Sequence, residues 1–102
     1  MTDFTLGVEE EFQIVNQDTF ALESAMTRLL ELAESSDIQP ELHESVVEVA
    51  TPVCNDVQEA RREISRNRQH VISLAKKVGC RILAASTHPF SPWEQQIIHS
   101  GK

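Results

Sequence analysis

Aromatic side chains, glycine and cysteine are scarce in this sequence of 102 residues. It contains no tyrosine, one tryptophan, three glycines and two cysteines. A disulfide scaffold or a zinc site needs more cysteines at closer spacing, so we expect Cys54 and Cys80 to be buried, reduced thiols. A nucleic-acid surface built on stacked aromatic rings is not indicated either.

Long apolar runs are absent, and basic residues are rare in the first half of the sequence. No run approaches the roughly 20 apolar residues of a membrane helix, and the first ten residues have neither the basic nor the apolar region of a signal peptide. We therefore expect a cytoplasmic protein with no membrane contact. The net charge is −7, and residues 1–55 hold twelve acids and one base, Arg28. This balance argues against nucleic acid as a partner, because phosphate binding needs clustered Lys and Arg. An acidic half suits a divalent cation better.

The hydrophobic pattern predicts a single α+β domain over residues 1–102. Period-two and helical spacings predict, in order, a strand over 4–15, a turn at 16–18, a short strand at 20–22, a helix over 24–35, strands over 40–43 and 46–51, a helix over 55–78 and a strand over 80–85. This order is typical of a mostly antiparallel sheet with two helices on one face. We expect Asn55 to cap the long helix and Gly79 to end it. Leu32 and Val57 are among the residues expected to face the core.

Three adjacent glutamates stand inside the first predicted strand, in GVEEEFQIV. Alternation places Glu9 and Glu11 on one face, about 7 Å apart, and Glu10 on the opposite, apolar face, where it needs a partner or an edge position. Carboxylates on one face repel unless a cation lies between them, and Mg²⁺ takes oxygen ligands. Glu48 repeats the feature inside VVEVAT, so three carboxylates from two strands could converge. On spacing alone, glutamates on a solvated face fit the same pattern.

The basic residues of the second half fall mainly on the long predicted helix, where we expect a solvated outer face: Arg61, Arg62, Arg66, Arg68, Lys76 and Lys77. The histidines outside the last loop, His43, His70 and His99, match no metal-ligand spacing and are expected at the surface.

Three segments together resemble a known enzyme family. LGVEEEFQIV, VVEVATPVC and AASTHPFSPWEQQ are similar to the successive N-terminal motifs of the type 2 glutamate–cysteine ligases, also called carboxylate–amine ligases, and the likeness covers essentially the whole chain. The resemblance implies a glutamine-synthetase-like fold, in which a curved antiparallel sheet forms a funnel-shaped active site. It also implies the use of ATP and Mg²⁺ (or Mn²⁺) to join a carboxylate, such as the γ-carboxylate of glutamate, to an amino-acid amine through an acyl phosphate.

The resemblance also assigns site residues. It makes Glu9, Glu11 and Glu48 metal ligands, in agreement with the argument from strand faces. Thr87 and His88 correspond to the family's active-site loop and are the catalytic candidates, although His88 could instead be a loop histidine bonded to the backbone. No nucleotide-binding residue can be assigned.

The chain departs from the family in its length, because family members run to several hundred residues. The later metal ligands, nucleotide-binding elements and substrate-binding arginines have no counterpart here. We therefore expect an N-terminal portion that is inactive alone, or alternatively a non-catalytic metal-binding or oligomerising module. A divided sheet leaves unpaired edges, which predicts a homo-oligomer. Glu44 stands where many relatives have an amide, which leaves its hydrogen bonds open.

Overall fold

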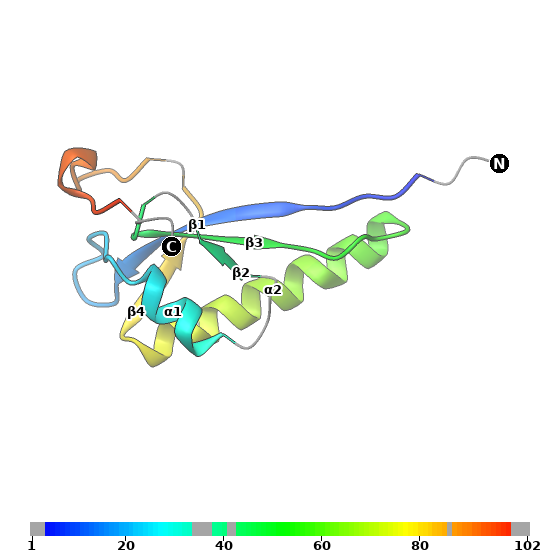
Figure 1. The fold of residues 1–102 in the computed structure, drawn as a ribbon, viewed down its shortest axis with the longest axis horizontal. Helices are drawn as coiled ribbons and strands as arrows, with labels where there is room; N and C mark the ends of the chain where they lie inside the picture. Colours follow the sequence, from blue (N-terminus) through cyan, green and yellow to red (C-terminus); the bar gives the residue numbers. More distant parts are fainter. Residues whose placement is uncertain (1–3, 34–37, 41–42, 86, 99–102) are drawn as a thin grey trace.

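The computed structural model describes residues 4–33, 38–40, 43–85 and 87–98. Its elements are, in chain order, β1 (Glu9–Asn16), α1 (Met26–Leu32), β2 (Ile38–Pro40), β3 (Val46–Ala50), α2 (Val57–Lys77), β4 (Cys80–Leu83) and the 3₁₀ turn η1 (Trp93–Gln95). The four strands form one sheet in the order β2-β3-β1-β4, and every neighbouring pair is antiparallel. Both helices lie on the same side of this sheet (Figure 1). The predicted α+β class, with two helices on one face of an antiparallel sheet, is confirmed.

The strands are shorter than the alternating pattern predicted, because a strand extends only as far as its partner. The first strand begins at Glu9, and the residues before it continue along the segment after β3 through an isolated bridge between Leu6 and Cys54 and hydrogen bonds between Val8 and Thr51. The predicted strand at 20–22 is reduced to one bridge, between Val15 and Leu22. The strand expected at 40–43 is Ile38–Pro40, and residues 41–42 lie outside the described part of the chain.

The core lies between the helices and the facing side of the sheet. Its buried apolar residues come from both layers: Phe12, Ile14, Ile38, Val47 and Val49 from the strands, and Ala25, Met26, Leu29, Val71, Leu74 and Ala75 from the helices and the start of α1. Leu32 and Val57 do not join it, contrary to expectation, with 44% and 73% of their surfaces exposed. Each stands at a helix end, the last residue of α1 and the first of α2.

The ends of α2 follow capping rules, although the N-cap is not the residue we predicted. Asp56, and not Asn55, is the N-cap, because its carboxylate accepts a hydrogen bond from the Glu59 amide at 2.7 Å. The Glu59 carboxylate in turn accepts from the amide of Asn55 at 2.9 Å. At the other end, Gly79 adopts a φ of 74°, which favours glycine, and the predicted stop is confirmed.

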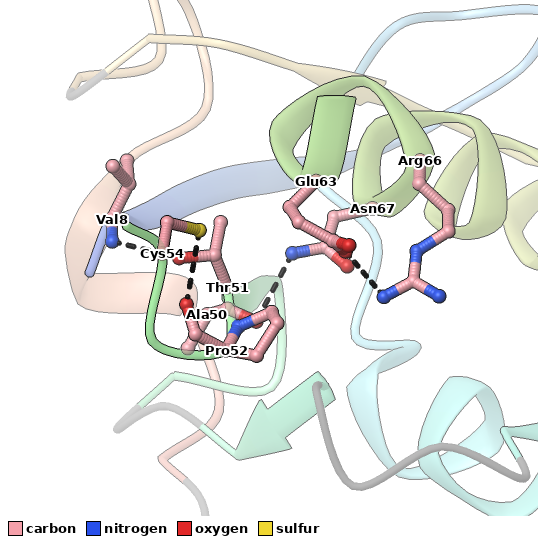
Figure 2. Close-up of polar contacts among 8 residues, drawn as sticks. All are labelled: Val8, Ala50, Thr51, Pro52, Cys54, Glu63, Arg66 and Asn67. Atoms are coloured by element: carbon pink, nitrogen blue, oxygen red, sulfur yellow. Dashed lines mark hydrogen bonds and ion pairs between the residues drawn. The ribbon is translucent and has the colours of Figure 1, made fainter. Parts of the chain in front are cut away.

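One buried polar side chain ties α2 to the sheet. Asn67 lies on the inner face of the helix, and its Nδ2 donates to the carbonyl oxygen of Ala50 at the end of β3, at 3.0 Å (Figure 2). The exposed neighbour Arg66 instead forms an ion pair with Glu63 on its own helix. Apolar periodicity gave no sign of Asn67, because that pattern counts only hydrophobic positions. Within the described residues, no helix is long and apolar enough to cross a membrane.

Both cysteines are free and buried, as expected. The Sγ of Cys54 donates to the carbonyl of Pro52 at 3.2 Å, in the turn that follows β3 (Figure 2). In the same turn the hydroxyl of Thr51 accepts from the amide of Val8 at 3.0 Å. These contacts fit the interpretation of Cys54 as a packed residue.

Candidate functional site

The three glutamates of β1 divide between the two faces of the sheet. Glu10 lies on the helix side, where its carboxylate accepts hydrogen bonds from Arg68 of α2, from Nε at 3.0 Å and from Nη2 at 2.6 Å. The predicted need of Glu10 for a partner is therefore confirmed. The hydrogen bond that Arg68 donates to Glu10, and then the negative charge of Glu10, raises the pKa of the Arg68 guanidinium above its usual value. Arg68 is exposed, as expected for a solvated face, but its ion pair with Glu10 of β1 was not predicted.

The open face of the sheet, away from the helices, carries the other carboxylates. In the antiparallel register of β1 and β3, Glu11 lies directly opposite Glu48. Residues paired in this way project to the same face with their Cβ atoms about 4.5–5.5 Å apart. Glu9 follows two residues away on the same face of β1 and is exposed. The fold thus brings all three candidate metal ligands to one face and sets two of them side by side.

Geometry alone does not assemble these carboxylates into a metal centre. In the described parts of the chain, no group of three or more His, Cys, Asp or Glu side chains is arranged so that it could hold a metal ion. Glu11 and Glu48 also take part in interactions with other groups. The three-carboxylate metal site stays a prediction.

A cleft lies on the open face, two positions along β1 and β3 from the pair of Glu11 and Glu48. Its floor includes Gln13 of β1 and Val46 of β3, which are opposite one another in the register. The segment after β4 lies on the side of the sheet away from the helices (Figure 1). This segment and the loops near it supply the walls of a cavity of about 500 Å³, which are formed by Leu22, His43, Ser45, Thr87, His88, Ser91, Pro92, Glu94 and Gln96.

The two catalytic candidates, His88 and Thr87, differ in their exposure to solvent. His88 is buried, and its Nδ1 accepts from the amides of Phe90 and Ser91 at 3.2 and 3.0 Å. Its Nε2 must then carry the proton, which it donates to the carbonyl of Phe20 at 2.7 Å. These are the bonds of a loop histidine held by the backbone, the alternative that the sequence left open. Thr87 is exposed on the cleft wall. The catalytic role of both residues stays a prediction.

The loop that His88 holds is locally strained. The carbonyl of Phe20 accepts the hydrogen bond from His88 Nε2. Phe20 itself has a φ of 61°, a conformation that non-glycine residues rarely adopt. The predicted turn before it is present, because Asn16 Oδ1 accepts from the amides of Asp18 and Thr19 at 2.8 and 3.0 Å. His88 therefore fastens this turn to the loop after β4 and fixes the shape of the cleft.

Sequence reasoning did not place His43 and Gln13 in the cleft, and it left open the hydrogen bonds of Glu44, which lies outside the cleft lining. His43 was expected at the surface, but it is half buried in the cleft wall. Gln13 received no role, because a glutamine in an alternating strand resembles any other polar position. Glu44, which replaces an expected amide, accepts from the Thr27 hydroxyl at 2.7 Å and from the Thr27 amide at 3.3 Å, in the first turn of α1. His70 is also half buried, and His99 lies outside the described residues.

The fold and the site define an α+β domain whose open sheet face carries opposed carboxylates beside a cleft. The family model of glutamate-cysteine ligase family 2 (GCS2) matches residues 5–101. The chain therefore belongs to glutamate–cysteine ligase family 2.

Curated relatives from three bacteria carry one name, "Putative glutamate--cysteine ligase 2". The protein from Herpetosiphon aurantiacus is 48% identical over 99 residues, which cover 94% of this chain and 26% of the relative. The protein from Sorangium cellulosum is 46% identical over 104 residues, or 97% and 28%. The protein from Chloroflexus aurantiacus is 49% identical over 98 residues, or 93% and 25%. The chain thus spans about a quarter of the length of these relatives.

Proposed function

We propose that this chain forms one wall of the active site of an ATP-dependent carboxylate–amine ligase and supplies carboxylates for its metal ion. The observation that carries the proposal is the cross-strand pair of Glu11 and Glu48. Like charges directly opposite one another destabilise a sheet. A divalent cation bound by this pair would turn that repulsion into attraction.

The donor set fits Mg²⁺ or Mn²⁺. Carboxylate oxygens are hard ligands, and Mg²⁺ is commonly held by one or two of them while waters and substrate phosphates complete its coordination. Glu11 and Glu48 would be the primary ligands, with Glu9 beside them on the same face. When bound, such a cation neutralises the charge that builds up as a phosphoryl group passes from ATP to a carboxylate.

The reaction we propose is the one that the family's name describes. A carboxylate oxygen of glutamate, or of a similar acid, attacks the γ-phosphorus of ATP, and ADP leaves. An amino-acid amine then attacks the acyl carbon, and inorganic phosphate leaves. The cleft beside the carboxylates would bind the substrate: Thr87 offers a hydroxyl on its wall, and His88 holds the loop in place.

The 102-residue chain by itself is expected to bind metal without turnover. It spans about a quarter of its relatives, and the funnel-shaped, glutamine-synthetase-like sheet that the family implies would need strands beyond the four described. Turnover belongs to a protein that carries this segment at the full length of the family. Release of ADP there should depend on both an acid and an amine.

Metal binding by this chain tests the proposal directly. We expect Mn²⁺, followed by electron paramagnetic resonance of the free ion, to bind the chain, and we expect Glu11→Gln and Glu48→Gln to weaken that affinity about tenfold or more, since each removes an anionic ligand. Glu31→Gln is the matched control, because Glu31 is exposed on α1 and far from β1 in sequence. If all three variants bind Mn²⁺ equally well, the carboxylates are only solvated and the proposal fails.

A further inference from the structure

A buried glutamine at the floor of the cleft has an oxygen with no hydrogen-bond partner. Gln13 lies on β1, the strand between β3 and β4, and only 7% of its surface is exposed. Its Oε1 is buried and accepts no hydrogen bond. Native proteins rarely leave a buried acceptor in this state, so each such atom calls for an explanation, for example a catalytic role or a bound partner.

Three other polar side chains of the cleft are already hydrogen-bonded to the backbone. Both ring nitrogens of His88 are bonded to the backbone. The Ser91 hydroxyl accepts from the amide of Leu22 at 3.1 Å, and Gln96 donates its Nε2 to the carbonyl of Pro92 at 3.0 Å. Among the described residues, Gln13 Oε1 is the one buried side-chain oxygen with no hydrogen-bond partner.

We propose that Gln13 Oε1 accepts a hydrogen bond from the amine of the amine substrate. This inference rests on the proposed ligase function. A free acceptor calls for an N–H or O–H donor, and the cleft lies about 7 Å along the strands from the opposed carboxylates Glu11 and Glu48. A carboxylate has no proton to donate at neutral pH, so the amino group of the amine substrate is the donor that this oxygen would bind. Rotation about χ3, which is soft in glutamine, turns Oε1 toward the cavity.

The test compares two ligands that differ only in the amine. L-cysteine and 3-mercaptopropionate share the thiol and the carboxylate, and their affinities for the isotopically labelled chain can be measured by NMR titration in MgCl₂. We expect L-cysteine to bind about tenfold more tightly or better, as a hydrogen bond to a charged donor predicts. Gln13→Met, which keeps the shape and loses the acceptor, should abolish this preference. Gln13→Glu, which keeps an acceptor oxygen, should retain it.

A glutamine outside the cleft provides the control. Gln58→Met removes an exposed carboxamide from α2, on the helix side of the sheet, and it should leave the preference for the amine intact. The inference is overturned if the wild-type chain binds both ligands equally or neither, or if Gln13→Met keeps the preference. A parallel Mg²⁺ titration of Glu11→Gln separates the two ideas. If Glu11→Gln binds Mg²⁺ as tightly as the wild type does, the ligase proposal is contradicted. If Glu11→Gln weakens Mg²⁺ binding but the wild type does not prefer L-cysteine, only the role of Gln13 is contradicted.

Discussion

At the scale of the residue, the surroundings of Cys80 change the pKa of its thiol. Burial raises the pKa of the Cys80 thiol, and the nearby negative charge of Glu23 raises it further, while Arg28 acts in the opposite direction. The folded protein therefore keeps the Cys80 proton at a higher pH than the unfolded chain does.

This difference predicts a pH dependence of stability. The contribution of Cys80 is complete below the ordinary thiol pKa of about 8.5 and is lost as the pH rises through the higher pKa of the folded state. We expect the free energy of unfolding, measured with urea, to fall above about pH 8.5, by less than the limit of about 1.4 kcal/mol per pH unit for one proton. The fall should be smaller in Cys80→Ala and should persist in Cys54→Ala. Parallel curves for the wild type and Cys80→Ala would contradict the prediction.

The behaviour of individual side chains was predictable where it depends on the local chain alone. Alternation was enough to separate Glu10 from Glu9 and Glu11. The partner of Glu10 was not predictable, because Arg68 is 58 positions away and only the docking of α2 brings it near. Gln13 and Asn67 were missed for the same reason, since a polar residue becomes informative only when tertiary packing buries it.

At the scale of the element, the start of α2 offers a choice between two adjacent caps. Asn55 and Asp56 are both good N-cap residues, and the sequence does not distinguish them. In the structure Asp56 caps the helix with its carboxylate, whereas Asn55 contributes only its backbone amide to Glu59. The interaction of the Asp56 negative charge with the helix dipole adds to the hydrogen bond.

We therefore expect Asp56→Ala to lower the free energy of unfolding by about 0.5–2 kcal/mol. Asn55→Ala, which keeps the backbone amide, should cost only a few tenths of a kcal/mol. Urea denaturation of both variants checks the prediction. Equal losses would mean that the side chain of Asn55 shares the cap.

The elements themselves were largely predictable, and their ends were not. The order, the antiparallel pairing and the stop at Gly79 follow from apolar spacing and glycine chemistry. Strand ends depend on where the neighbouring strand runs out, and the register of β1 against β3, which sets Glu11 opposite Glu48, depends on that same pairing. The sequence placed Glu9 and Glu11 on one face of a strand, but it did not give the pairing of Glu11 with Glu48 or the presence of Gln13 and His43 in the cleft.

At the scale of the whole molecule, apolar surface remains exposed. Residues 4–8 run beside the first half of α2, and a groove of about 630 Å³ between them is lined mainly by apolar side chains, including Leu6, Val8 and Ile64. Phe4 has 78% of its surface exposed nearby in sequence, and β2 and β4 are the edges of the described sheet. Such features favour association with another apolar surface or strand.

We therefore expect the chain to form a dimer or a higher homo-oligomer at tens of micromolar, with light scattering after size-exclusion chromatography as the measurement. Val57→Lys places a charge in the groove and should shift the population toward the monomer. Glu31→Lys, an exposed change on α1, is the matched control. A wild-type chain that is entirely monomeric at this concentration would contradict the prediction.

The ion pair between Glu10 and Arg68 also favours the observed register of β1 against β3. If β1 slipped by one position against β3, every side chain would change face. Glu9 and Glu11 would then be buried in the apolar layer beneath α2. Glu10 would lose its ion pair with Arg68 and face the solvent. A shift of β1 by one position would therefore be unfavourable twice, through burial of Glu9 and Glu11 and through loss of the Glu10–Arg68 ion pair, so the three adjacent glutamates favour the observed register.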